Sequence, residues 1–261
     1  MLDIRALSFA YGENKVLDNI DFSAGAGEFV AVLGPNGVGK STFFRCILGL
    51  LRSYEGTVEI GGKEVRSVPR RELARLAAYI PQSSDPVFDY TVLDAVLMGT
   101  AGTLDALRTP GREQIERAKK AMADVGIYEL RDHGIGRISG GERQLVLIAR
   151  ALAQNARLLV MDEPAANLDY GNQYRILEQF RRLTEQGYTV LLSTHNPDHA
   201  LRFASHILAL QGPGEYVTGT TAAVMNEEFL EKTYHIPVMV TETDTAIGRL
   251  RSCIPLLGGK T

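Results

Sequence analysis

The stretch Gly34-Pro35-Asn36-Gly37-Val38-Gly39-Lys40-Ser41-Thr42 lies between two apolar segments. Five apolar residues, 29–33, precede it, and an apolar-periodic segment, 43–50, follows it. This order predicts a strand, a glycine-rich loop and a helix, which is the context that a phosphate-binding loop requires. The glycines let successive backbone N–H groups curl around an anion, and the new helix adds the positive end of its dipole. Lys40 would then reach the β- and γ-phosphates of a nucleotide, and the Ser41 hydroxyl would ligate Mg²⁺.

The composition is that of an ordinary globular protein. The chain has 261 residues and a formal net charge of −3, which gives no support for nucleic acid as a partner, because nucleic-acid-binding domains are strongly basic. The two cysteines, Cys46 and Cys253, fit no metal-ligand spacing. The N-terminus lacks the apolar core of a signal peptide, and no run of about 18 uncharged apolar residues occurs. We therefore expect a chain in a reducing compartment that meets a membrane only through a partner.

The first half of the chain divides into two parts. Alternating apolar residues predict short, antiparallel strands around one parallel strand in the first 65 residues, at 2–9, 16–22, 29–33 and 57–60. A helix beginning at Pro69 and a strand at 78–82 follow. Residues 87–137 then predict an all-helical insertion, with a helix capped by Thr91, a loop at 99–111 and a helix at 113–125.

After residue 139, strands and helices alternate, which predicts a parallel sheet with helices on both faces. The expected helices are 140–154, 174–186, 198–204 and 226–234, and the expected strands are 158–161, 190–193 and 207–210. The pattern predicts no element from Thr241 onward. The fold class is therefore α/β, a P-loop NTPase core with a parallel sheet, an N-terminal antiparallel β subdomain and an inserted helical subdomain. We expect one domain over 1–240, with its helical insertion at about 87–137, and a tail at 241–261.

An acidic pair, Asp162-Glu163, closes the apolar strand at 158–161. Parallel α/β sheets place their ligands at this edge of the strands. Asp162 fits a carboxylate that positions Mg²⁺, and Glu163 fits a general base for water. The alternative, two solvated loop acids before Pro164, is less favoured once a phosphate-binding loop lies upstream.

The segment Ser139-Gly140-Gly141-Glu142 opens the helix at 140–154. Serine followed by glutamate at this spacing predicts a capping box. Two glycines in the first turn are costly for a helix, so they favour the close approach of another group to the backbone. The N-terminus of a helix is suited to an anion.

Taken together, these residues resemble the nucleotide-binding subunit of an ABC transporter. The matching motifs are the adenine-stacking aromatic at Tyr11, Walker A at 34–42, the Q-loop at Gln82, the ABC signature at 138–144 with Ile138 where leucine is commonest, Walker B with its catalytic glutamate at 158–163, the D-loop at 167–169 and the switch histidine at His195. The signature motif separates this family from other phosphate-loop ATPases, so the resemblance is specific.

The resemblance implies an ATPase in which two identical chains face head to tail around two ATP molecules. Ser139, Gly140 and Gly141 of one chain would close on the γ-phosphate held by Walker A of the other. Glu163 would polarise the attacking water, and His195 would hold the γ-phosphate. The implied catalytic residues are Glu163, His195, Gln82 and Asp169; the implied nucleotide contacts are Tyr11, Val16, Asn36, Gly37, Gly39, Lys40, Ser41, Thr42, Ser139, Gly140, Gly141 and Glu142; and the implied Mg²⁺ ligands are Ser41, Gln82 and Asp162.

A narrower resemblance concerns the tracts 87–99 and 167–173, which are similar to importer ATPases for iron-siderophore, haem, vitamin B12 and related metal chelates, a group with some molybdate or tungstate members. It implies two permease subunits docked on the helical insertion, near Gln82, and an extracytoplasmic substrate-binding protein. It also implies a peripheral position on the cytoplasmic face of the inner membrane. The cargo itself never touches this subunit.

Two alternatives stay open, an exporter ATPase subunit and a soluble ABC ATPase of repair, translation or cluster assembly. The chain lacks fused membrane helices, a long coiled-coil insertion and a second ATPase domain, which favours the importer. One departure from the family is the D-loop region, where Ala165 and Asn167 replace the commoner serine or threonine and serine or histidine. Because Asp169 is present, we expect hydrolysis, with altered coupling between the two sites.

Overall fold

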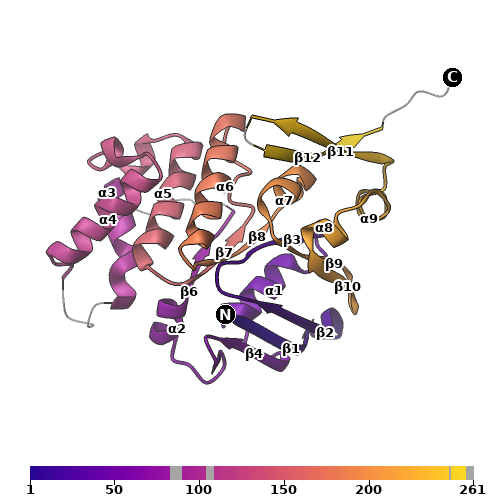
Figure 1. Ribbon diagram of the computed structural model, residues 1–261. Coiled ribbons are helices and arrows are strands. Elements are labelled where there is room, and N and C mark those ends of the chain that lie inside the picture. Colours follow the sequence, from indigo (N-terminus) through magenta and orange to yellow (C-terminus); the bar gives the residue numbers. More distant parts are fainter. Residues whose placement is uncertain (83–89, 104–108, 247, 257–261) are drawn as a thin grey trace.

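A six-stranded sheet forms the centre of the fold (Figure 1). The structure is a computed structural model that describes residues 1–82, 90–103, 109–246 and 248–256. The strands of the central sheet, in spatial order, are β10 (Glu215–Thr220), β9 (His206–Gly212), β3 (Phe29–Leu33), β8 (Thr189–Ser193), β7 (Leu158–Asp162) and β6 (Ala77–Ile80). All are parallel to their neighbours except β10, which pairs antiparallel with β9. The predicted parallel sheet is confirmed, and its near-continuous apolar strands are those of a sheet covered on both faces.

A smaller antiparallel sheet covers one side of the central sheet. Its strands, in spatial order, are β2 (Asn14–Ala24), β1 (Leu2–Tyr11), β4 (Glu55–Ile60) and β5 (Lys63–Glu64). The helix α1 (Lys40–Ile47) packs between the two sheets, and its Phe43 and Phe44 are fully buried in a core that both sheets share. A short helix, α2 (Arg70–Leu76), leads into β6. The predicted N-terminal antiparallel subdomain is confirmed.

Helices cluster at one end of the central sheet. They are α3 (Val92–Leu97), the 3-10 helices at Met98–Thr103, Tyr128–Leu130 and Ile135–Arg137, α4 (Arg112–Asp124) and α5 (Gly140–Gln154). Thr91 caps α3 through a capping box with Asp94, as predicted. The predicted loop 99–111 begins in the first 3-10 helix, while its part at 104–108, like the start of the insertion at 87–89, lies outside the described residues.

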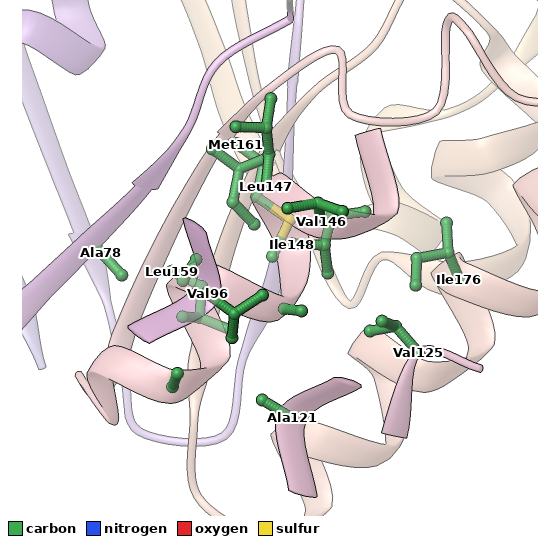
Figure 2. Packing of buried hydrophobic residues seen from close by; sticks show 14 of the residues in the cluster. Ala78, Val96, Ala121, Val125, Val146, Leu147, Ile148, Leu159, Met161 and Ile176 are labelled. Carbon is green, nitrogen blue, oxygen red and sulfur yellow. The ribbon is translucent and has the colours of Figure 1, made fainter. Parts of the chain in front are cut away.

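The helix α5 joins this cluster to the central sheet. Figure 2 shows Val146, Leu147 and Ile148 of α5 among side chains from β7 and from α4. The 3.6-residue spacing of apolar positions lets α5 face the strands on one side and the inserted helices on the other. The core of the insertion is thus continuous with the core under Walker B.

The remaining helices lie over the other parts of the sheet. They are α6 (Tyr170–Glu185), α7 (Pro197–Phe203), α8 (Thr221–Val224) and α9 (Glu227–Tyr234). The start of α6 differs from the predicted Tyr174, because the Asp169 side chain accepts the Asn172 N–H and caps the helix earlier. The sequence analysis also missed β10 and α8. Within the described residues, no helix has the length and apolar character that crossing a membrane requires.

The chain ends in a β-hairpin of β11 (Val238–Thr245) and β12 (Gly248–Pro255), where no element was predicted from Thr241 onward. The hairpin lies against α7 (Figure 1). The Cys253 N–H donates to Asp198 Oδ1 at 2.8 Å, and Arg202 donates to Ser252 Oγ at 3.1 Å. The division into a domain at 1–240 and a tail at 241–261 stays a prediction.

The crossing of the first 3-10 helix over α5 yields a stability prediction. A Cβ on Gly99 would lie 2.1 Å from the Arg150 carbonyl oxygen. Gly99→Ala should therefore lower the free energy of unfolding by about 2 kcal/mol, measured by urea denaturation. Gly102→Ala is the matched control, because its Cβ would meet only Ala74 Cβ at 3.6 Å. Equal effects of the two substitutions would show that the close crossing is not a constraint.

Candidate nucleotide-binding site

The loop between β3 and α1 forms an open backbone cradle. Gly37 and Gly39 have φ angles of +81° and +114°, which favour glycine. A Cβ on Gly39 would lie 2.8 Å from Val16 Cγ1, so Val16 packs directly on the loop. The helix α1 begins at Lys40 with no side-chain cap, which leaves its first backbone N–H groups available to an anion. Asn36 is exposed within the loop.

Lys40 is folded back onto its own loop. Its Nζ donates to the carbonyl oxygens of Gly34 at 2.7 Å and Pro35 at 3.0 Å. Burial lowers the pKa of Lys40, and the negative charges of Glu163 and Asp162 oppose that shift. A phosphate in the loop would offer this buried ammonium group a charged acceptor in place of two neutral carbonyls.

Two hydroxyl groups hold the carboxylate of Asp162. Ser41 Oγ donates to Asp162 Oδ2 at 2.6 Å, and Ser193 Oγ donates to Asp162 Oδ1 at 2.7 Å. Mg²⁺ prefers oxygen ligands and is usually bound through one or two carboxylates, waters and substrate phosphates. The Ser41 and Asp162 oxygens therefore fit this ion.

Glu163 lies beside Asp162 in a strained backbone conformation, with φ +47°. Its N–H donates to Ser193 Oγ at 3.0 Å. Its Oε2 lies 3.3 Å from both Gln82 Nε2 and His195 Nδ1. The structure thus brings together three predicted catalytic residues from the ends of three strands.

The sequence analysis missed the role of Ser193 and of Asn167 in this arrangement. Ser193 pairs with Asp162 in the β7–β8 register, and a lone serine at the end of an apolar strand is the only signal that the sequence offered. The Asn167 side chain donates to the Gln82 carbonyl oxygen at 3.1 Å and so joins the D-loop to the Q-loop. Asp169 caps α6, where a hydrogen bond from the Asn172 backbone holds the pKa of its carboxyl below the usual value.

The segment 139–142 opens α5, and its Gly141 lies against the D-loop, where a Cβ would be 3.6 Å from the Asn167 carbonyl oxygen. The predicted capping box is confirmed: Ser139 Oγ accepts the Glu142 N–H at 3.2 Å, and the Ser139 N–H donates to Glu142 Oε2 at 2.7 Å. Ser139 and Gly140 are exposed, and a Cβ on Gly140 would meet no atom closer than 4.0 Å. Among the described residues, no hydrogen bond joins this segment to the loop at 34–42.

Tyr11 ends β1 and is 46% exposed. Its ring meets Phe9 edge-on, with centroids 4.9 Å apart and an interplanar angle of 81°. Phe9 is buried, so it fixes the Tyr11 ring at the surface. This geometry leaves an aromatic face on which a planar base could stack.

A glycine-rich phosphate loop between a parallel strand and a helix, with carboxylates at the end of β7, on the far side of β8 from β3, defines an ATPase core of the phosphate-loop class. The sequence model of the family described as "ABC transporter" matches residues 17–166. The chain belongs to that family.

Three relatives illustrate the match. An ABC transporter ATP-binding protein of Haemophilus influenzae is 36% identical over 234 residues, which are 90% of this chain and 89% of the relative. A protein of Helicobacter pylori named as a probable iron chelatin transport ATP-binding protein is 34% identical over 240 residues, 91% and 94% of the two chains. A solved structure described as an inward-facing metal-chelate type ABC transporter has a TM-score of 0.86 at 29% identity and covers 98% of this chain and 97% of its own.

The expected family and fold are therefore confirmed. The chain is an ATP-binding subunit of an ABC transporter, an ATPase whose reaction is coupled to transport through a separate permease. ATP-binding subunits of this family work as dimers with membrane permease partners. The individual site residues and their roles stay predictions.

The position of Ser193 yields a prediction about turnover. Ser193→Ala removes the hydroxyl that holds both Asp162 and the Glu163 backbone, so kcat for ATP should fall about 10-fold or more while ADP still binds. Thr189→Val is the matched control, because Thr189 is equally buried at the opposite end of β8 and donates to Gly25 O. If both variants turn over at the same rate, Ser193 does not act on the acidic pair.

Proposed function

We propose that this chain hydrolyses ATP at a site completed by a second copy, and that hydrolysis powers the import of a metal chelate or a metal oxyanion. The observation that carries the ATPase proposal is the convergence of Gln82, Glu163 and His195 beside the Ser41–Asp162 pair. A base, its orienting partners and a Mg²⁺ site within one cluster are what water attack on a phosphate requires.

The residues of the cluster take separate roles. Lys40 and the backbone of the loop at 34–42, with Thr42, bind the phosphates, while Val16 and Asn36 flank them and Tyr11 stacks on adenine. Ser41 and Asp162, with Gln82, hold Mg²⁺, which when bound neutralises charge on the phosphate oxygens. Glu163 orients the attacking water and accepts its proton. His195 holds the γ-phosphate, and Asp169 fixes the start of α6 beside the D-loop.

The second copy supplies Ser139, Gly140 and Gly141, which close on the γ-phosphate. Support comes from the exposure of Ser139 and Gly140, from the open space around Gly140 and from the place of all three residues at the N-terminus of the long helix α5. Glu142 holds Ser139 in place through the capping box. Ser139 and Gly140 are exposed, and among the described residues no hydrogen bond joins their segment to the loop at 34–42, which favours a site shared by two chains.

The cargo proposal rests on the relatives. The Helicobacter pylori protein is named for iron chelatin transport, and the structural relative is described as a metal-chelate type transporter. The described part of the tract 87–99 and the tract 167–173 fit the same group. Two permease subunits and an extracytoplasmic substrate-binding protein are the proposed partners, with this chain on the cytoplasmic face of the inner membrane.

Glu163→Gln tests the catalytic proposal. The amide cannot accept a proton from water, so steady-state hydrolysis should fall at least about 100-fold while ATP binding persists. Turnover is measured by phosphate release and binding by a labelled nucleotide. Glu28→Gln is the matched control, because Glu28 is partly buried near a strand start, where it accepts the Gly25 N–H. Hydrolysis by Glu163→Gln at nearly the wild-type rate would reject Glu163 as the base.

Co-purification from native membranes tests the transport proposal. The tagged chain, extracted in mild detergent, should recover a multi-helix permease, and the binding protein of that system should carry a metal chelate or oxyanion identified by metal analysis and mass spectrometry. Recovery with ribosomal or repair proteins would reject transport. Recovery of a permease whose binding protein carries a ligand without metal would reject only the proposal about the cargo.

A further inference from the structure

Hydrogen bonds of Thr194 and Asn196, and not of the His195 side chain, hold the turn that contains His195. The His195 side chain is 66% exposed, and its Nδ1 lies 3.3 Å from Glu163 Oε2. Thr194 is buried, and its N–H donates to Val32 O at 3.3 Å on the adjacent strand β3. Thr194 Oγ1 also accepts the Asn196 N–H at 3.1 Å and so closes the turn around His195.

A second histidine meets the same hydroxyl. His199, in α7, is 7% exposed, and its Nδ1 lies 3.3 Å from Thr194 Oγ1. A hydroxyl group has one proton and two lone pairs, so Oγ1 can share a hydrogen bond with Nδ1 in either neutral tautomer of the ring while it accepts the Asn196 N–H. Burial lowers the pKa of His199 to about 4, which keeps the ring neutral at neutral pH.

The ring of His199 is itself fixed from two sides. Tyr174 of α6 meets it edge-on, with centroids 5.7 Å apart and an interplanar angle of 89°. The C-terminal hairpin holds α7 through Asp198 and Arg202, which bond to Cys253 and Ser252. These contacts hold the His199 ring in one position, so the ring can orient the Thr194 hydroxyl.

We propose that Thr194 and His199 are positioning residues for His195. The His199 ring orients the Thr194 hydroxyl, the hydroxyl holds the turn at Asn196, and the turn sets where the His195 imidazole meets Glu163 and the γ-phosphate. One small cavity beside the catalytic cluster is lined by Glu163 and by the four residues of this arrangement, Thr194, His195, Asn196 and His199. The proposal rests on the role of His195 given under the proposed function.

The test compares variants that keep or remove the contact, in the full-length chain. Thr194→Val and His199→Phe keep shape but lose the hydrogen bond, and each should lower kcat for ATP about 10-fold. Thr194→Ser should stay within about twofold of the wild type, and His199→Asn, which keeps a hydrogen-bonding amide near the place of Nδ1, should recover part of the lost rate. The dissociation constant for ADP should change less than about twofold in all four, because ADP lacks the γ-phosphate that His195 contacts.

The His195→Ala background separates a positioning role from a structural one. In that background Thr194→Val should cause no further loss, and the double variant Thr194→Val/His199→Phe should be no slower than either single variant. Equal rates for Thr194→Val and Thr194→Ser, or parallel losses in kcat and ADP affinity, would overturn the proposal. If His195→Ala itself retains the wild-type rate, the assigned role of His195 fails, and the positioning proposal fails with it.

Discussion

The parallel pairing of β3, β8, β7 and β6 is the constraint on which the site depends. It places the carboxyl ends of these strands at one edge of the sheet. The phosphate loop follows β3, the turn that contains His195 follows β8, the acidic pair closes β7, and Gln82 follows β6. The register sets Asp162 opposite Ser193, so that one hydroxyl holds both the Asp162 carboxylate and the Glu163 backbone. A slip of one residue would turn these side chains to the other face of the sheet.

The site at this edge of the sheet could be predicted from the sequence because each motif follows an apolar strand. Glycine spacing, the acidic pair and the capping box are local patterns, and the phosphate loop, Glu163 and Ser139 could be placed from them alone. The bonds of Ser193 and of Asn167 join segments far apart in the chain, so no local pattern predicts them. The C-terminal hairpin was missed for a different reason: most of its residues are exposed or half-buried, and so it lacks the regular apolar alternation of a buried strand.

One chain holds only part of the proposed site. The loop at 34–42 and the cluster around Glu163 lie together, whereas Ser139 and Gly140 are exposed at the start of α5 and bond within their own segment. The core is continuous from α5 to β7, so the signature segment and the Walker B segment belong to one packed unit. Closure of two such units on ATP would therefore move the inserted helices, and with them a docked permease.

The central claim is that the γ-phosphate site needs two copies of the chain. The most direct measurement is the mass of the Glu163→Gln chain in solution by light scattering, with and without Mg²⁺ and ATP. The account predicts twice the 28.6 kDa mass of one chain with ATP, and a single-chain mass when Ser139→Arg is added although ATP still binds. A Glu163→Gln chain that binds ATP and keeps the single-chain mass, or a dimer that persists with Ser139→Arg, would contradict it.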